Sequence, residues 1–298
     1  MEYHKPVLLN ECIDGLNIKE DGVYIDATFG GGGHSRAILE RLNKNGKLIG
    51  FDQDEAAWQN QPKDERFIMI KQNFRHLQRF LKLKDILSAD GILADLGVSS
   101  YQFDTADRGF STRFDGPLDM RMNAKQELSA LDVVNNYNET QLLKVFSSYG
   151  EVRNSRQLAK FIVEQRRDVS ITTTKEFADL VSKRAIGNLN KYLSQVFQAI
   201  RIEVNDEINA LKDFLKQSVN VLNSGGRLVV LSYHSLEDRL VKNVIRWGDP
   251  EVEPERDVYG KYFLPLKAIN KKLILPSEEE MELNSRARSA KLRIAEKV

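Results

Sequence analysis

The sequence predicts an α/β fold, in which a parallel sheet with crossover helices is interrupted once by an inserted, mainly helical domain. Short apolar runs alternate with amphipathic stretches from residue 23 to residue 98. No strand-like run then follows before residue 227, and the interval has helical periodicity. The α/β pattern resumes at residue 208, so the sheet is completed after the insertion. We expect a sheet domain over 1–103 and 193–298 and an inserted domain over 104–192.

The elements of the sheet domain follow from two simple patterns. Strands are expected where apolar residues run together, and helices where they recur every three or four positions. In chain order the expected elements are a strand over 23–29, a helix over 34–42, a strand over 47–51, a short helix, a strand over 67–70, a helix over 74–83, a strand over 91–98 and, after the insertion, a helix over 208–222, a strand over 227–233, a helix over 236–247 and an antiparallel edge strand over 291–298.

Composition excludes several protein classes. The 298 residues carry a formal net charge of +1, with 41% hydrophobic and 29% charged residues, which is typical of a globular chain and not of a disordered or collagen-like one. The longest apolar runs have the length of strands, so we expect no membrane span and a cytoplasmic protein. The single cysteine, Cys12, is expected in the core, and with four scattered histidines it predicts neither a disulfide nor a metal site.

A glycine-rich turn predicts a nucleotide site. Gly30 to Gly33 lie between a predicted strand and a predicted helix, and Asp52 ends the next strand, where an acid can accept hydrogen bonds from ribose hydroxyls. The dinucleotide pattern Gly-x-Gly-x-x-Gly fails at its third position, whereas Asp-x-x-x-Gly-x-Gly is met by Asp26, Gly30 and Gly32. This favours S-adenosylmethionine over a nicotinamide cofactor. A glycine turn without a ligand and a nicotinamide-dependent oxidoreductase are the alternatives.

Asp95 ends the fourth predicted strand, at the edge where open α/β sheets bind their ligands. Its carboxylate could accept a hydrogen bond from an amine that is being methylated and stabilise the positive charge that develops there. A turn-capping acid is the alternative. Many amino-methyltransferases have Asp-Pro-Pro-Tyr at this point, but here Leu96, Gly97 and Val98 follow, so the aromatic partner of the base is not identified.

Further candidates lie at the late strand and in basic segments. His234 closes the late strand and could contact a base or a phosphate, or be a structural histidine, while Ser235 and Asp238 have the spacing of a helix cap. Cations interleaved with aromatic residues, and a second basic cluster near the end of the chain, suit RNA. A solvated loop and a protected edge strand are the respective alternatives. The basic candidates are Arg108, Arg113, Arg121, Arg286 and Arg288.

Seven stretches in this order resemble the family of 16S ribosomal RNA cytosine-N4 methyltransferases: 24–35, 95–100, 107–111, 116–122, 196–205, 232–239 and 286–293. The resemblance covers nearly the whole chain. It implies a class I S-adenosylmethionine-dependent methyltransferase with a helical RNA-recognition insertion, which methylates N4 of a cytidine in the decoding (P-site) region of 16S rRNA in the small ribosomal subunit. The cofactor positions that it implies are Gly32, Gly33, His34, Asp52, Phe74, Asp95 and Gln102.

One departure from the family concerns segment 187–195, which lacks the usual basic run, so part of the RNA contact could move to Tyr192. The sequence leaves a homodimer open. It also leaves open a non-catalytic RNA-binding factor that keeps the cofactor fold.

Overall fold

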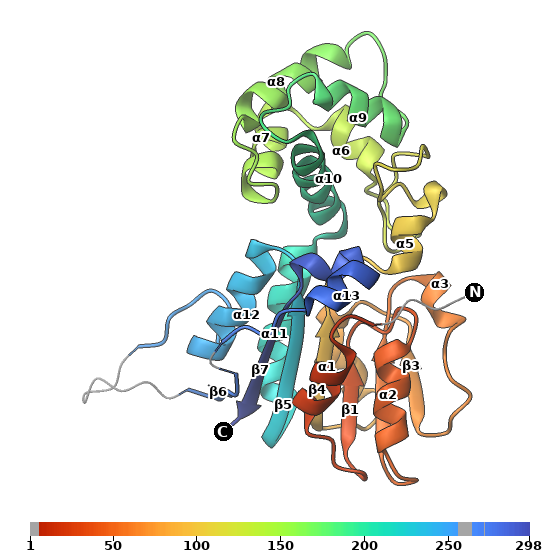
Figure 1. The fold of residues 1–298 in the computed structure, drawn as a ribbon, viewed down its shortest axis with the longest axis vertical. Helices are drawn as coiled ribbons and strands as arrows, with labels where there is room; N and C mark the ends of the chain where they lie inside the picture. The colour runs from red at the N-terminus through yellow and green to blue at the C-terminus, as the bar shows by residue number, and fades with distance from the viewer. Residues whose placement is uncertain (1–5, 256–263, 271) are drawn as a thin grey trace. The chain divides into compact units, whose positions relative to one another are not determined.

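The structure is a computed structural model that describes residues 6–255, 264–270 and 272–298, and it divides into two compact units (Figure 1). The first, here called the sheet unit, comprises 1–97 and 208–298. The second, the helical unit, is Val98–Glu207. Each unit is described by itself below.

The described part of the sheet unit contains one seven-stranded sheet in the order β3-β2-β1-β4-β5-β7-β6. The first five strands in this order are parallel, and β7 and β6 continue the sheet in antiparallel pairs. Since strand order reverses between β1 and β4, their carboxyl ends form the switch point at which such sheets bind ligands. The strands are β1 Val23–Asp26, β2 Lys47–Phe51, β3 Phe67–Ile70, β4 Ala89–Asp95, β5 Leu222–Ser232, β6 Leu266–Ala268 and β7 Lys291–Lys297.

Apolar side chains cover both faces of the sheet, because successive strand residues point to opposite sides. Ile25 and Ile49 face a core that includes residues of α4, α11 and α12, whereas Tyr24 and Leu48 face a core built with α1 and α2. Cys12 is fully buried in the second core, as predicted. The helices of this unit are α1 Leu9–Leu16, α2 Gly33–Arg41, α3 Glu55–Trp58, α4 Leu77–Lys82, α11 Glu207–Val221, α12 Ser235–Trp247 and α13 Glu278–Leu283, with 3-10 turns η1 Phe74–His76 and η3 Ser285–Ser289.

The helical unit has a core of its own, in which Phe146, Leu158, Phe177 and Val196 are fully buried. The unit extends beyond the predicted insertion of 104–192 at both ends. At its later end the reason is α10, a single helix whose residues Val196 to Val204 pack into this core. The helices are α5 Ser100–Asp104, α6 Ala130–Asn136, α7 Glu139–Ser148, α8 Ser155–Gln165, α9 Thr174–Ser182 and α10 Leu189–Asn205, with the 3-10 turn η2 Ala106–Arg108.

The last strand differs from its prediction. β7 is not an edge strand, because β5 pairs with one side of it and the three-residue β6 with the other. The interpretation of the basic segment 286–293 as protection of a sheet edge is therefore wrong. Arg293 within β7 is instead bound to Asp238, with 2.7 Å between Nε and Oδ1.

The first and fourth strands are shorter than predicted and end at Asp26 and Asp95. After Asp26 the carboxylate accepts a hydrogen bond from the backbone N–H of Thr28 and bends the chain locally, although the N–H of Phe29 still donates to the carbonyl of Phe51 at 2.9 Å. In the described part of the chain no helix has the length and hydropathy needed to cross a membrane. Nor does any group of three or more His, Cys, Asp and Glu side chains there have a metal-binding arrangement.

Candidate functional site at the switch point of the sheet

The glycine turn after β1 is held in place by the side chain of Asp26. This buried carboxylate accepts hydrogen bonds from the Thr28 backbone N–H at 3.1 Å and from the Ser35 hydroxyl at 2.7 Å. Burial raises its pKa, and His34 and these donors oppose the rise. Gly32 has a φ of +73° and caps α2, a conformation that favours glycine. Asp26 therefore shapes the turn.

Asp52 follows β2 and reaches the same turn. Its Oδ2 accepts a hydrogen bond from the backbone N–H of Gly30 at 2.8 Å, and its Oδ1 accepts one from the N–H of Asp54 at 2.8 Å. Burial raises the pKa of Asp52 to about 6. A carboxylate oxygen accepts more than one hydrogen bond, so both oxygens keep capacity for the hydroxyls of a ribose.

Phe74 comes close to this region through its neighbour. The Asn73 side chain donates to the side-chain oxygen of Gln53 at 3.1 Å, and Gln53 is adjacent to Asp52. The Phe74 ring packs edge-on against Phe214, with 5.1 Å between ring centroids. A flat apolar surface beside a ribose-binding acid is suited to an adenine ring, and this role for Phe74 stays a prediction.

Asp95 is the point where four segments meet. Its backbone N–H donates to the Thr28 hydroxyl at 2.7 Å, its Oδ1 accepts from the Tyr233 hydroxyl at 2.6 Å, and its Oδ2 lies 4.0 Å from His34 Nδ1. Burial raises the pKa of Asp95 to about 7, the Tyr233 hydrogen bond opposes the rise, and the charge of Glu237 adds to it. The carboxyl group is thus poised between its two protonation states near neutral pH.

The His34 ring directs Nδ1, a nitrogen without a proton, toward Asp95. Its Nε2 lies 3.2 Å from the carbonyl oxygen of Val7, which can only accept, so Nε2 carries the proton. Burial lowers the pKa of His34, which favours the neutral ring and leaves Nδ1 as an acceptor. Two acceptors, His34 Nδ1 and Asp95 Oδ2, therefore face each other across 4.0 Å.

His234 is the N-cap of α12, so the structural alternative is the one that the geometry shows. The Glu237 carboxylate accepts from the backbone N–H groups of Tyr233 at 2.9 Å and His234 at 3.4 Å, and the imidazole lies 3.2 Å from it. The predicted cap of Ser235 and Asp238 is wrong by one residue, because His234 and Glu237 take these positions. A contact between His234 and RNA stays a prediction.

Gln102 lies in the helical unit, where it forms a reciprocal cap of α5 with Ser99. The Ser99 N–H donates to Gln102 Oε1 at 3.0 Å, and the Gln102 N–H donates to the Ser99 hydroxyl at 3.2 Å. The side chain is buried. It fixes the start of α5, and its predicted contact with the cofactor stays a prediction.

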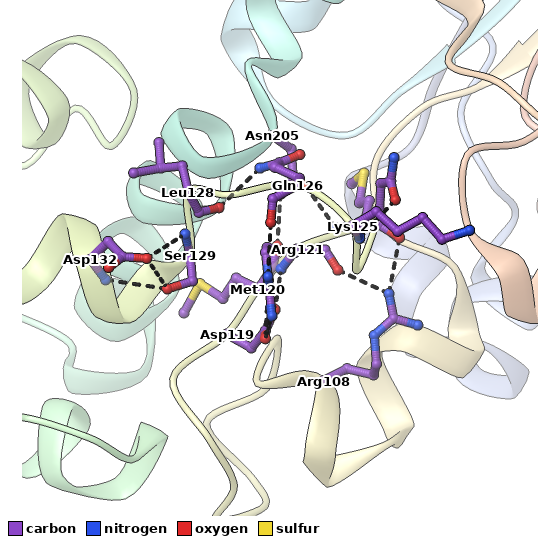
Figure 2. A network of polar contacts seen from close by, with 12 residues as sticks. Arg108, Asp119, Met120, Arg121, Lys125, Gln126, Leu128, Ser129, Asp132 and Asn205 are labelled. Carbon is purple, nitrogen blue, oxygen red and sulfur yellow. Dashed lines mark hydrogen bonds and ion pairs between the residues drawn. The ribbon is translucent and has the colours of Figure 1, made fainter.

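Two of the three arginines predicted after the fourth strand are bound within the helical unit (Figure 2). Arg121 Nη2 lies 2.7 Å from Asp119 Oδ2, and its Nη1 donates to the carbonyl of Gln126 at 2.8 Å. Arg108 Nη2 donates to the carbonyl groups of Arg121 at 2.9 Å and Met122 at 3.1 Å. These guanidinium groups fold the loop between η2 and α6.

Sequence reasoning missed the amide side chains that hold the same loop. Asn205 donates to the carbonyl of Met120 at 2.8 Å (Figure 2) and accepts from the N–H of Met122 at 2.7 Å. Gln126 donates to the carbonyls of Leu128 and Val204. Met120 has a φ of +58°, a conformation that is uncommon for a residue other than glycine, and Asn205 binds the carbonyl of this same residue. The only sequence signal was the position of Asn205 at the end of motif 196–205.

The remaining candidates differ in exposure. Arg113 is exposed, with its guanidinium 5.9 Å from the ring of Phe103, and Phe114 beside it is 46% exposed. Arg286 and Arg288 lie in η3 of the sheet unit, and Arg288 is exposed. Tyr192 is buried in the core of the helical unit, so the expectation that it takes over an RNA contact is wrong.

Comparisons with known proteins agree over the whole chain. A family model described as the MraW methylase family matches residues 1–298. A protein named ribosomal RNA small subunit methyltransferase H from Flavobacterium johnsoniae is 57% identical to this chain, over 100% of this chain and 99% of its own length. A protein of the same name from Bacteroides thetaiotaomicron is 53% identical, over 100% of this chain and 98% of its own length. A solved rRNA methylase structure from Streptococcus thermophilus matches with a TM-score of 0.43 and 12% identity, over 97% of this chain and 93% of that one.

Proposed function

Because this chain belongs to the MraW methylase family, we propose that it methylates N4 of a specific cytidine in the P-site region of 16S rRNA, within the small ribosomal subunit. The chain is an S-adenosylmethionine-dependent rRNA methyltransferase of class I fold, as the sequence predicted. The proposal of cytidine N4 as the target is supported by the arrangement around Asp95, which suits an exocyclic amine.

The residues present fit S-adenosylmethionine. Asp52 would hold the ribose hydroxyls, and the turn Gly30 to Gly33 offers backbone beside a helix N-terminus, which favours a carboxylate. A Cβ at Gly32 would lie 2.8 Å from the Phe29 ring and one at Gly33 2.2 Å from Pro6, so the packing of the turn itself requires glycine at both positions. When bound, the cofactor supplies a methyl group already activated by its sulfonium, so no protein nucleophile or metal is required.

The observation that carries the proposal is the arrangement of the Asp95 carboxylate at the end of β4. One of its oxygens is hydrogen-bonded, and the other faces a second hydrogen-bond acceptor. Asp95 Oδ1 is held by Tyr233, whereas Oδ2 lies across 4.0 Å from His34 Nδ1. An exocyclic amine carries two N–H donors, so a pair of acceptors can orient it and favour the positive charge that develops on nitrogen. The proton that the amine must lose after methylation can pass to Asp95 or to water.

RNA recognition is proposed for the inserted domain, for which the sequence predicted 104–192. Exposed Arg113 beside the exposed ring of Phe114 has the composition that binds phosphates and splayed bases. Arg286 and Arg288 of the sheet unit are proposed as further phosphate contacts. Because N4 of a paired cytosine lies within the stack, the base must be extruded before methylation. The proposed substrate implies a cytoplasmic enzyme, and the proposal needs no second copy of the chain.

The test is methyl transfer to small subunits purified from a strain that lacks this gene. Mass mapping of the modified nucleoside should find one N4-methylated cytidine in the P-site region of 16S rRNA. A methyl group on another nucleotide would contradict the proposed target. Binding of these subunits without methyl transfer would favour a non-catalytic factor. Calorimetric binding of NADH, with none of S-adenosylmethionine, would favour the oxidoreductase.

A further inference from the structure

Tyr233 and Asp95 are joined across two neighbouring strands. Asp95 is the last residue of β4 and pairs in register with Leu231 of β5, and Tyr233 is the residue that follows β5. The Tyr233 hydroxyl donates to Asp95 Oδ1 at 2.6 Å, within the range of a charge-assisted hydrogen bond to a carboxylate. A Cβ at Gly97 would lie 3.6 Å from Tyr233 Cδ2, so the ring also covers the turn that leaves β4.

The backbone holds Tyr233 and Asp95 in this relation. The buried Glu237 in the first turn of α12 accepts from the backbone N–H of Tyr233 at 2.9 Å, and the Asp95 N–H is bound to the Thr28 hydroxyl at 2.7 Å. Both partners of the pair are therefore anchored by groups outside it. The backbones that carry the two side chains are therefore fixed relative to each other by the sheet and by these hydrogen bonds.

The charges that face Asp95 come from every element packed around it. Glu237 of α12, Asp26 of β1 and Cys12 of α1 interact electrostatically with Asp95 or with Tyr233, and His34 of α2 lies 4.0 Å from Oδ2. Burial and the charge of Glu237 raise the pKa of Asp95, and the hydrogen bond from Tyr233 lowers it. Burial raises the pKa of Tyr233 well above its usual value, so its hydroxyl keeps its proton and can only donate to a carboxylate.

We propose that Tyr233 is a positioning residue for methylation, which fixes the Asp95 carboxylate through Oδ1 so that Oδ2 is left for the target amine. This inference rests on the proposed function of Asp95.

The test compares the parent with Tyr233→Phe, which keeps the ring and removes the donor. The matched control is Tyr24→Phe, since the Tyr24 hydroxyl is also buried but accepts from the backbone N–H of Lys19 at 2.7 Å, away from Asp95. Carbon-13 NMR of labelled aspartate follows the Asp95 carboxyl without RNA, and Asp95→Asn assigns its signal. Single-turnover methyl transfer is then measured as a function of pH on small subunits.

Loss of the donor should raise the apparent pKa of Asp95 by about one unit in Tyr233→Phe. The acid limb of the rate profile should move by the same amount, with about tenfold slower transfer at pH 6 and a rate within threefold of the parent at pH 9. Tyr24→Phe should keep the parental profile. An unmoved Asp95 titration overturns the inference. A moved titration with an unmoved rate profile instead overturns the catalytic role of Asp95 on which the inference rests.

Discussion

Asp52 accepts a hydrogen bond from the backbone N–H of Gly30 at 2.8 Å, so the acid after β2 and the glycine turn after β1 form one structure. The sequence places these residues on separate strands, and only the parallel pairing of β1 with β2 brings them together. Asp52 therefore acts on a ligand in two ways. It presents acceptor capacity to the ribose, and it holds the turn in the conformation that the ligand meets.

Asp52→Ala should weaken S-adenosylmethionine binding at least tenfold, because hydrogen bonds to a charged acceptor are worth roughly 1.5 to 3 kcal/mol each. Isothermal titration calorimetry measures the affinity. Asp64→Ala is the matched control, since Asp64 is also an acid that accepts hydrogen bonds, but its partner is Arg66 at 2.6 Å at the start of β3. The assignment fails if Asp52→Ala binds within twofold of the parent, or if the control loses as much affinity.

Arg113 and Arg121 should behave differently, although their sequence contexts are alike. Arg113→Ala should weaken binding to the small subunit and lower the slope of log affinity against log salt by about one, because one phosphate contact is lost. Cofactor affinity should not change. The measurement is binding over a series of salt concentrations, with calorimetry for the cofactor. A parental salt slope in Arg113→Ala would remove this residue from the RNA interface.

Arg121→Ala should instead destabilise the protein, since Arg121 is bound by Asp119 at 2.7 Å and by the carbonyl of Gln126 at 2.8 Å. A loss of about 2 kcal/mol in unfolding free energy is expected from these charged hydrogen bonds. Denaturant unfolding gives the value, and Asp119→Ala should lose a similar amount. Undiminished stability in both variants would show that the contacts of Arg121 with Asp119 and Gln126, drawn in Figure 2, contribute little to the unfolding free energy.

The order of strands and helices could be predicted because their apolar periodicity is local. The strands over 47–51 and 67–70 match β2 and β3. The contact of Asp52 with the glycine turn was not predicted, because it depends on the pairing of β1 with β2. β6 was missed because three residues, Leu266–Ala268, are too short for a pattern. Tyr233, Glu237 and Asn205 were missed as site or scaffold residues for a different reason. Their roles arise from partners more than fifty residues away or from a backbone turn, which spacing along the chain does not encode.

Asp95 variants should separate hydrogen bonding from charge in the methylation step. Asp95→Ala should raise the barrier by about 2 to 4 kcal/mol, by analogy with the loss of one preorganised polar partner. Asp95→Asn keeps one acceptor oxygen and should retain more activity. Single-turnover rates with saturating cofactor and RNA are the measurement, and the circular dichroism of both variants should match the parent. Transfer by Asp95→Ala at the parental rate would exclude Asp95 and direct attention to His234.

The pKa of Asp95 also predicts how stability changes with pH. Its folded-state pKa is raised to about 7 from the ordinary value of 3.8. Between these values the folded protein holds a proton that the unfolded chain has released, so the stabilisation present below pH 4 is lost as the pH rises through 7. His34 acts in the opposite direction, because its pKa is lowered and stability falls when the pH drops.

A comparison of the parent with Asp95→Asn measures what the Asp95 carboxyl group contributes. The unfolding free energy of the parent should fall more steeply between pH 5 and pH 8 than that of Asp95→Asn, by about 2 to 3 kcal/mol, because two pKa units of differential proton binding lie in this window. Asn at this position still offers an oxygen to the Tyr233 hydroxyl, which keeps the packing and the hydrogen bond in both proteins. Since His34 is present in both proteins, the difference between the curves reports the loss of the Asp95 carboxyl group, including its interaction with His34 across 4.0 Å. Denaturant unfolding without cofactor at four pH values gives both curves, and parallel curves would mean that Asp95 ionises in the folded protein at its ordinary pKa.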